Sequence, residues 1–316
     1  MKVSILTPIY GVEQFIAQCA RSLMEQTYED IEFIFVNDCT RDASVHVLQA
    51  TLDQYPHRAH QVSIINHPVN KGVGCARKTA LDAATGDAIL YVDSDDYVAA
   101  TAVQVLVGAM CAQDVDIVDG GYSIVTGGRV VRDFKPLHVN NMKYLKTILC
   151  QDVEPNRIWG RLIKRSLFTD NGISFTPGID YSEDFSVLPR LLINAKRGWA
   201  DDCIYYYRDD NPDSYTNNIS TGNAISFLKA QQLVGEHMAS TALWRDCRVA
   251  AELGWVNVWR FARRFNVDFR LVDGHFTLRP SCLATSCLAA IMRSHVPYPI
   301  ANFIYKAARR AYLSMI

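Results

Sequence analysis

The chain has 316 residues, 49% of them hydrophobic and 21% charged, which is the composition of an ordinary globular protein and not of a disordered one. Lys and Arg number 32 against 33 Asp and Glu, so the formal net charge is -1, and this balance argues against a general nucleic-acid binder. The nine cysteines include no Cys-x-x-Cys pair. We therefore expect reduced thiols in a cytoplasmic protein, and neither zinc ligands nor disulfides.

The amino-terminal half alternates predicted strands with predicted helices. Strands are expected at 3–7, 31–36, 62–65 and 88–92, and helices at 14–25, 43–54, 75–84 and 98–112. This alternation predicts a mostly parallel sheet with right-handed crossovers. The first residues enter a strand pattern without the features of a secretory signal, so export is not expected. The most apolar long stretch, 98–112, is shorter than the ~20 residues of a membrane span and indicates a core helix.

The regular alternation ends after this helix. Further strands are expected at 116–118, 122–125, 129–134 and 203–208, with a hairpin turn at Gly127-Gly128. Residues 140–200 mix short helices with loops, and from about residue 220 the pattern is helical. We expect an α/β domain at 1–216 and a helical region at 217–316, with a soft boundary near Thr216.

Three carboxylates follow the predicted strand at 88–92. Asp93, Asp95 and Asp96 lie at its carboxyl end, the edge where ligands bind in an open α/β sheet. Acids in this position indicate a site for a divalent cation, a sugar hydroxyl or both. The alternative is a solvated turn whose Asp caps the helix from about Val98. A calcium loop is disfavoured, because Val98 stands where such a loop has its glycine.

Two common nucleotide-binding motifs do not explain the glycines of the third loop. Gly72-Val73-Gly74 is similar to the start of a dinucleotide-binding loop, but Arg77 occupies the position of the third glycine or alanine. The loop also follows the third strand and not the first. The sequence contains no P-loop.

Five segments together resemble the family 2 glycosyltransferases, nucleotide-sugar-dependent enzymes with the glycosyltransferase A fold. They occur in the family's order and fall within residues 1–210; they are Ser4–Tyr10, Val36–Asp42, Asn70–Gly72 with Ala76-Arg77, Asp93–Asp96 and Ser182–Asp184. Cys39 replaces a frequent glycine and Lys78 a frequent asparagine, and neither touches the chemistry. The resemblance implies an α/β fold with a Rossmann-like, mostly parallel sheet and helices on both faces, followed here by a C-terminal helical extension.

The resemblance also implies an activity, the inverting transfer of a sugar from a nucleoside diphosphate donor to a glycan or lipid-linked acceptor. A UDP-sugar is the favoured donor, and bacterial surface polysaccharide synthesis is the setting it suggests. Two alternatives stay open. A sugar-phosphate nucleotidyltransferase would have a glycine-rich, basic loop after the first strand, and residues 8–13 are neither. A protein that binds a nucleotide sugar without turnover would not need the acids Glu183 and Asp184.

The same resemblance assigns donor-binding roles. They fall on Thr7, Pro8, Tyr10, Asp38, Gly72, Arg77, Asp93, Ser94, Trp159 and Arg161. Asp38 is suited to accept a hydrogen bond from a ring N–H of uracil or guanine, and Asp93 is expected at the ribose. Ordinary alternatives exist for several of them: Asp38 could cap the helix near Ala43, and Tyr10 and Trp159 could pack in the core.

The resemblance places Mn2+ or Mg2+ at Asp95 and Asp96, where the ion would offset charge on the departing nucleoside diphosphate. It places the general base at Asp184, with Glu183 as the second choice, at the start of a helical pattern. The ordinary explanation of these two acids is the helix dipole, which stabilises such residues by about 0.3–1 kcal/mol each. Asp180 is close enough in sequence to compete for the assignment.

Two further segments carry smaller expectations. In Tyr205-Tyr206-Tyr207-Arg208 the alternation of a strand predicts that Tyr206 faces away from its two neighbours, and Arg208 is a candidate for diphosphate contact. Residues 304–312 are expected to form a basic amphipathic helix. It could rest on an anionic membrane surface near a lipid-linked acceptor, but a solvated helix face or a contact within a homo-oligomer is the simpler explanation.

Overall fold

The computed structural model describes residues 1–150, 156–211 and 220–316, and the chain divides into two compact units. Unit 1 comprises Met1–His138, Ile158–Gly178 and Asn194–Asn217, and unit 2 comprises Val139–Arg157, Ile179–Ile193 and Asn218–Ile316. Unit 2 therefore includes two segments from within the predicted domain 1–216, because their helices pack with the later helices. The expected boundary near Thr216 lies outside the described residues.

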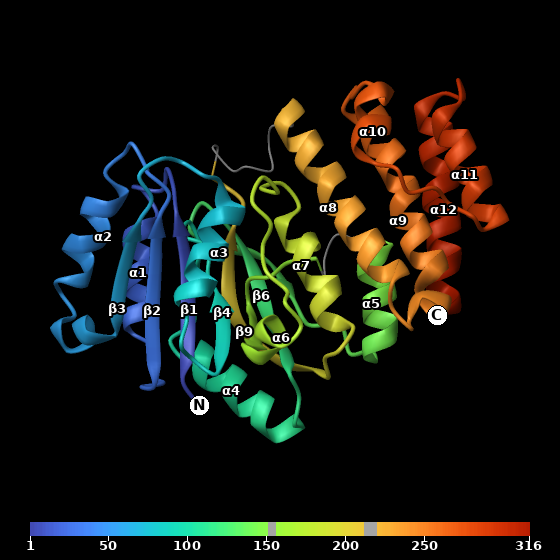
Figure 1. The fold of residues 1–316 in the computed structure, drawn as a ribbon. Coiled ribbons are helices and arrows are strands. Elements are labelled where there is room, and N and C mark those ends of the chain that lie inside the picture. Colours follow the sequence, from blue (N-terminus) through green and yellow to red (C-terminus); the bar gives the residue numbers. More distant parts are fainter. Residues whose placement is uncertain (151–155, 212–219) are drawn as a thin grey trace. The chain divides into compact units, whose positions relative to one another are not determined.

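Unit 1 is built on one sheet (Figure 1). Among its described residues the strand order is β3-β2-β1-β4-β8-β6-β9-β5, with β7 paired to β6. The strands are β1 Val3–Ile9, β2 Ile31–Asn37, β3 Val62–Asn66, β4 Ala88–Tyr91, β5 Tyr97–Val98, β6 Ile117–Thr126, β7 Arg129–Phe134, β8 Arg161–Lys164 and β9 Arg197–Arg208. Neighbours among β1 to β4 pair in parallel, as predicted, whereas β8 pairs antiparallel with both β4 and β6.

Four sequence expectations about this sheet differ from the structure. The two strands expected at 116–118 and 122–125 form one strand, β6. The helix expected from about Val98 is α4 (Ala102–Gln113), because Tyr97–Val98 pair with β9 and form β5. The strand β8 is not visible in the sequence pattern, since four residues are too few to show an alternation. The strand β9 begins at Arg197 and not at Cys203.

Helices cover both faces of the sheet, as the resemblance implies. Alternate side chains of β1, β2 and β4, such as Ile5, Phe33 and Leu90, share one buried core with α1, α2 and α4. On the other face α3 contacts β1 and β2 (Figure 1). Burial on both faces explains why these strands are almost entirely apolar. The remaining elements of unit 1 are α1 Ile16–Met24, α2 Ser44–Leu52, η1 Pro56–Gln61, α3 Val73–Ala83 and α6 Ser166–Thr169.

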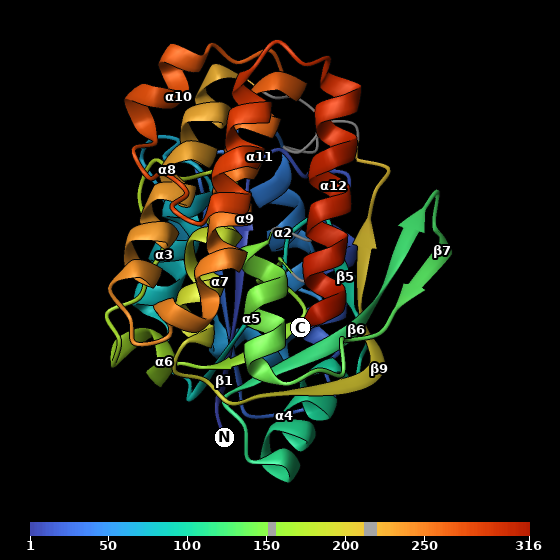
Figure 2. The same ribbon diagram turned by 90° about the vertical axis from the view of Figure 1, so that its right-hand side faces the viewer.

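The described residues of unit 2 are helical (Figure 2). Its helices are α5 Asn141–Leu149, α7 Glu183–Leu192, α8 Thr221–Ala239, α9 Trp244–Arg264, α10 Phe269–His275, α11 Leu283–Arg293 and α12 Tyr298–Met315. Helix α9 is the centre of the unit, because it contacts α5, α8, α10, α11 and α12. The side chain of Ser220 caps the start of α8, and that of Asn140 caps α5. Within the described part of the chain, no helix combines the length and the apolar character needed to cross a membrane.

A buried carboxylate joins α9 to the start of α11. Glu252 has no exposed surface. It accepts hydrogen bonds of 2.5–3.1 Å from Arg248 Nε, Ser281 N and Oγ, Cys282 N and Thr285 Oγ1. Burial alone raises the pKa of Glu252, but the hydrogen bonds from Thr285, Arg248 and Ser281 outweigh it and lower the pKa to about 2.

We expect Glu252→Gln to lower the free energy of unfolding by about 3 kcal/mol at neutral pH, since each unit of pKa shift corresponds to ~1.4 kcal/mol. The pKa is lower in the folded state than the ordinary value of 4.5. The stabilisation is therefore complete above that value and is lost as the pH falls toward 2. Urea denaturation should show the largest difference at neutral pH and a smaller one at about pH 3. The exposed Glu236→Gln is the control, and a difference that does not shrink with acid would contradict this account.

Candidate active site

The loops that carry the predicted donor residues leave one edge of the sheet in unit 1. Parallel register places Ile9 beside Asn37 and Leu6 beside Tyr91, so the chain emerges from β1, β2 and β4 at neighbouring points. Thr7 is buried near the end of β1, and its hydroxyl has no hydrogen-bond partner among the described residues. Tyr10 follows β1 with 51% of its surface exposed, so it does not pack in the core.

Asp38 is buried and holds the loop that precedes α3. Its carboxylate accepts hydrogen bonds from Lys71 N at 2.9 Å and Gly72 N at 2.8 Å. Gly72 has a φ of 88°, a conformation that favours glycine, and this allows its N–H to reach the carboxylate. Asp38 does not cap α2; Asp42 does, by accepting from Ser44 N at 3.1 Å. The helix-capping alternative for Asp38 is therefore wrong.

His67 is a residue that sequence reasoning missed. Its Nδ1 lies 2.7 Å from Asp38 Oδ1, and its Nε2 lies 2.8 Å from Thr79 Oγ1. The ring is buried, so both nitrogens are used within the protein. His67 thus fixes the orientation of Asp38 against α3. The only signal in the sequence is its place directly after the third predicted strand, and that alone does not identify its partners.

Arg77 and Asp93 form an ion pair across the edge of the sheet. Arg77 on α3 is buried, and its Nη2 lies 2.9 Å from Asp93 Oδ1. The guanidinium also lies over the ring of Tyr91, 5.6 Å from its centre. Arg77 thus lies beside Asp93, and the donor-binding role that the resemblance assigns to it stays a prediction. Ser94, the next residue, is buried.

Asp95 lies next to these charges, and its side chain is held by Asn211. Asn211 Nδ2 donates to Asp95 Oδ2 at 2.9 Å. Burial, followed by the charge of Asp93, raises the pKa of Asp95. Asn211 comes from the segment after β9, which is remote in sequence, so the sequence gives no signal of this contact.

Asp96 points into the protein. Its Oδ2 accepts from the hydroxyl of Tyr205 at 2.7 Å, and its Oδ1 accepts from Arg208 N at 2.7 Å. The same hydroxyl accepts a hydrogen bond from Asp93 N at 3.1 Å. Burial, and then the charges of Asp95 and Asp93, raise the pKa of Asp96 well above its ordinary value. The prediction that Asp96 is a metal ligand does not fit this burial, because both oxygens are already held by β9.

The aromatic residues of β9 divide between two faces, as the alternation predicts. Tyr205 and Tyr207 stack on Trp159, with ring centres 4.4 and 5.4 Å away. Tyr206 stacks instead on Tyr97 at 4.7 Å. Trp159 is only partly buried but lies within this aromatic group, which agrees with the packing alternative.

Arg161 is placed differently from the prediction that it borders the sugar site. Its side chain has no exposed surface, and its Nη1 lies 3.2 Å from Asp119 Oδ1. Arg197 contacts the other oxygen of Asp119 at 2.9 Å. A fully buried side chain in such a triad cannot contact a donor, so Arg161 is a structural residue of β8.

Arg208 lies at the end of β9 with its side chain mostly covered. Its guanidinium lies 5.4 Å from the ring centre of Phe15 and 5.6 Å from that of Tyr97, and it donates a hydrogen bond to Gln18. Its backbone N–H supports Asp96, as described above. These contacts give Arg208 a fixed position, and its proposed contact with a diphosphate stays a prediction.

Glu183 and Asp184 are the first two residues of α7, in unit 2. Ser182 precedes them with a φ of 66°, which turns the chain sharply into the helix. Both acids are partly exposed. The helix dipole favours their charged forms, so their position suits carboxylates that are deprotonated at neutral pH and can accept hydrogen bonds. Asp180, the competing acid, has its backbone N–H bonded to Ser226 Oγ at 2.7 Å.

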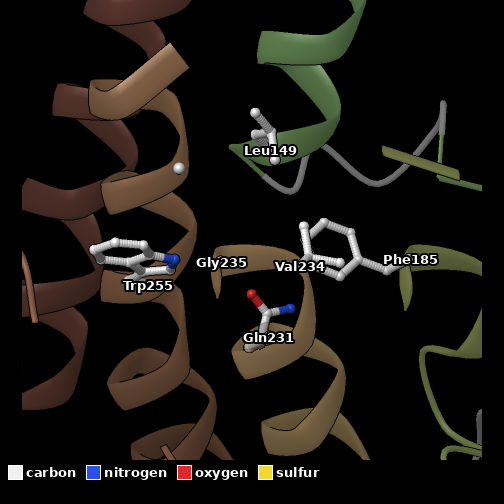
Figure 3. Close-up of a pocket in the computed structure, with 7 residues that line it drawn as sticks. Leu149, Phe185, Gln231, Val234, Gly235 and Trp255 are labelled. Carbon is white, nitrogen blue, oxygen red and sulfur yellow. The ribbon is translucent and has the colours of Figure 1, made fainter. Parts of the chain in front are cut away.

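Unit 2 also contains a small cavity between helices (Figure 3). It is lined by Leu149, Phe185, Gln231, Val234, Gly235, Ala251 and Trp255. Gln231 is buried, and its Nε2 has no hydrogen-bond partner among the described residues. The other lining residues are apolar or small, and no acid is among them. The cavity therefore offers no acid for catalysis.

The residues at the acidic edge fit a divalent ion that is shared with a substrate. No cluster of three or more His, Cys, Asp or Glu side chains in the described ranges could hold a metal alone. Mg2+ commonly binds through one or two carboxylates together with substrate phosphates, so a complete protein cage is not required. Asp95, whose side chain is held by Asn211 and not by β9, is the carboxylate of this edge that we expect at a cation.

Solved structures share this fold. Residues 1–349 of S. aureus TarS in complex with UDP-GlcNAc match with a TM-score of 0.65 at 17% identity, covering 99% of this chain and 91% of that one. The mannosyltransferase PcManGT from Pyrobaculum calidifontis, in complex with GDP-Man and Mn2+, matches with a TM-score of 0.52 at 16% identity, covering 99% and 83%. Likeness at such identity shows the fold alone. That fold, with the acidic edge described above, is the glycosyltransferase A fold.

Sequence relatives define the family. The profile described as "Glycosyl transferase family 2" matches residues 4–172, more than half of the chain. The uncharacterized glycosyltransferase EpsJ of Bacillus subtilis (strain 168) is 33% identical over 223 residues, which are 68% of this chain and 62% of EpsJ. The poly(ribitol-phosphate) beta-glucosyltransferase of Bacillus spizizenii is 31% identical over 211 residues, 66% of this chain and 32% of that protein. The matched region is thus less than two thirds of either relative. The chain belongs to glycosyl transferase family 2.

Proposed function

We propose that this protein is an inverting, metal-dependent glycosyltransferase that moves a sugar from a UDP-sugar to a glycan or lipid-linked acceptor. The observation that carries the proposal is the edge formed by Asp93, Asp95 and Asp96, where each carboxylate has its own partner. Arg77 holds Asp93, Asn211 holds Asp95, and β9 holds Asp96. Carboxylates held in this way support the proposal of a ligand site over that of a solvated turn.

The donor would be bound by the loops of unit 1. Asp38 would accept a hydrogen bond from a ring N–H, which suits uracil or guanine, through Oδ2. His67 and Lys71 N occupy Oδ1, whereas Oδ2 accepts from Gly72 N alone among the described residues. Asp93, held by Arg77, is the acceptor for a ribose hydroxyl. The names of relatives favour uridine: TarS is described in complex with UDP and with UDP-GlcNAc, whereas PcManGT is described with GDP-Man.

Asp95 is the residue that would hold Mn2+ or Mg2+, with Asn211 keeping its carboxylate in position. When bound, such an ion offsets negative charge on the diphosphate that leaves the sugar. Tyr205 on β9 supports this part of the loop, because its hydroxyl accepts a hydrogen bond from Asp93 N and donates one to the carboxylate of Asp96.

Asp184 is the proposed general base, with Glu183 as the second choice. It would take the proton of an acceptor hydroxyl as that oxygen forms a bond to the anomeric carbon. In the same step the bond from that carbon to the diphosphate oxygen breaks, and the nucleoside diphosphate leaves with the electron pair. Attack opposite to the leaving group inverts the configuration.

We place the reaction in the cytoplasm and in bacterial surface polysaccharide synthesis. All nine cysteines are free thiols, which supports a reducing compartment. One relative is described as a poly(ribitol-phosphate) beta-glucosyltransferase and another, from Staphylococcus aureus, as the poly(ribitol-phosphate) beta-N-acetylglucosaminyltransferase TarS. These descriptions support a glycan-type acceptor for the present chain.

Thermal denaturation with UDP, GDP, CMP and ADP, each with and without Mn2+, tests the donor. A ligand that binds only the folded state stabilises it by about 2.7 kcal/mol at a concentration of about 100 Kd. We expect the largest shift with UDP and Mn2+ together, and a smaller shift when either is omitted. A protein stabilised by none of the nucleoside diphosphates would contradict the proposal. A UDP shift without consumption of any UDP-sugar would favour the alternative of a binding protein without turnover.

A further inference from the structure

Charge is distributed unevenly along the chain. Residues 274–316 contain no Asp or Glu and five Lys or Arg, at 279, 293, 306, 309 and 310. The remaining 27 Lys and Arg stand against all 33 Asp and Glu in residues 1–273, which gives that part a formal charge of -6. Such a separation of charge is typical of a chain whose basic end contacts a polyanion or a membrane.

Helix α12 packs against the rest of unit 2 along one side only. Ala301 and Tyr305 are its only buried residues, and the hydroxyl of Tyr305 donates to Leu253 O on α9 at 3.2 Å. Arg260 and Arg263 of α9 lie over the rings of Tyr305 and Tyr298. These two arginines are therefore used in holding α12 against α9.

The opposite side of α12 is exposed and has an unusual composition. Its exposed residues recur at the spacing of one helix face and are Pro299, Ile300, Phe303, Lys306, Ala307, Arg310, Ala311, Ser314 and Met315. Phe303 is 72% exposed, Ile300 53% and Met315 76%. A solvated helix face normally carries acidic and polar residues, whereas this one combines large apolar side chains with Lys306 and Arg310. This composition does not fit the alternative that the exposed side of α12 is an ordinary solvated helix face.

Helix α11 contacts α12 and adds exposed apolar side chains. It exposes Leu283, at 80%, together with Ala284, Cys287 and Ala290. Figure 2 shows α11 and α12 next to each other within unit 2. We refer to the exposed residues of α11 and α12 as the α11–α12 surface.

We propose that the α11–α12 surface binds peripherally to an anionic lipid membrane. Apolar side chains that enter the acyl boundary and basic side chains that meet anionic headgroups are the two requirements of an interfacial helix. A second copy of the chain fits less well, because a twofold contact would pair the α11–α12 surface with itself, and that surface carries Lys306 and Arg310 but no acid to neutralise them. A hydrophilic anionic polymer would attract the basic residues but would leave Phe303 and Ile300 in water.

Co-sedimentation with vesicles tests the proposal. We expect the full chain to bind vesicles of phosphatidylcholine mixed with phosphatidylglycerol, to bind phosphatidylcholine alone much more weakly, and to be released by salt. Lys306→Glu with Arg310→Glu should lower the partition coefficient by roughly 25-fold or more, since each basic residue near an anionic surface contributes roughly a factor of five. Phe303→Ser should weaken binding while leaving its salt dependence in place.

The matched control is Arg129→Glu with Val131→Ser, which changes an exposed basic and an exposed apolar residue on β7. It should bind vesicles as the wild type does. Binding that is equal in all variants, or no binding to anionic vesicles, would overturn the proposal. A concentration-dependent dimer that Phe303→Ser dissociates, without vesicle binding, would assign the surface to a second copy instead. Stabilisation by UDP is measured in the same samples, so failure of the donor site and failure of the membrane surface are separate results.

Discussion

Asp184→Asn is expected to reduce sugar transfer by roughly 10²–10⁴-fold, the range that a positioned general base contributes. The amide has nearly the same shape as the carboxylate but cannot accept the proton of the acceptor hydroxyl. Asp184 belongs to unit 2, whereas the residues proposed for the donor belong to unit 1. Stabilisation by UDP and Mn2+ should therefore be the same in the variant as in the wild type. Measurement of transfer rates together with the thermal shift separates loss of chemistry from loss of binding.

The controls for this prediction are the neighbouring acids. Glu183→Gln and Asp180→Asn change the charge of the same region and should reduce transfer by less than Asp184→Asn does. If Glu183→Gln abolished transfer while Asp184→Asn left it intact, the base would be Glu183. If all three variants kept the wild-type rate, neither acid of α7 would be the base, and the helix dipole would be a sufficient reason for their presence.

The first four strands and their loops could be predicted because their signals are local. Each strand of β1 to β4 is a short apolar run, and the polar residues of its loop follow within a few positions. The orientation of Tyr206 follows equally from the alternation of a strand, and its stacking on Tyr97 confirms it. The resemblance to glycosyl transferase family 2 rests on these same segments, so it identified the family correctly.

The partners of the site residues could not be predicted, because they come from distant parts of the chain. Trp159 and Arg161 are the residue types expected beside a sugar. The structure instead buries Arg161 in the sheet, where it contacts Asp119 together with Arg197. Asp96 has the same local pattern as Asp95, and only the pairing of β9 shows which of the two points inward. The sequence pattern alone therefore does not show that Asp96 is held by β9 whereas Asp95 is not.

The division into units was hidden for a similar reason. Residues 139–157 and 179–193 contain helical patterns of ordinary length, and nothing local in them indicates that they pack with α8 and α9. The proposed donor-binding residues belong to unit 1, and the proposed general base belongs to unit 2. The position of Asp93–Asp96 could be predicted because they directly follow a predicted strand. The position of α7 could not, because it depends on contacts with α8, which comes later in the chain.

The metal site gives the second large effect, because Asp95→Ala removes the only carboxylate that we propose as a protein ligand. We expect the variant to lose the Mn2+-dependent part of its stabilisation by UDP and most of its transfer activity. Asp96→Asn is the informative comparison. Since Asp96 is bound by Tyr205 and Arg208 inside the protein, this change should lower the melting temperature without ligand but keep a response to Mn2+. The opposite pattern would make Asp96 the ligand.

Asn211→Ala extends the same test to the residue that positions Asp95. Loss of a partner that orients a metal ligand commonly weakens metal affinity by about 10–100-fold. We therefore expect Asn211→Ala to need a correspondingly higher Mn2+ concentration for the same UDP-dependent stabilisation, and to recover it fully at saturation. Asn194→Ala, which removes an amide bonded to Asn171 elsewhere in unit 1, is the matched control. A purely structural role for Asn211 would lower the melting temperature without moving the Mn2+ midpoint, so that result would remove it from the metal site and leave Asp95 without a positioning partner.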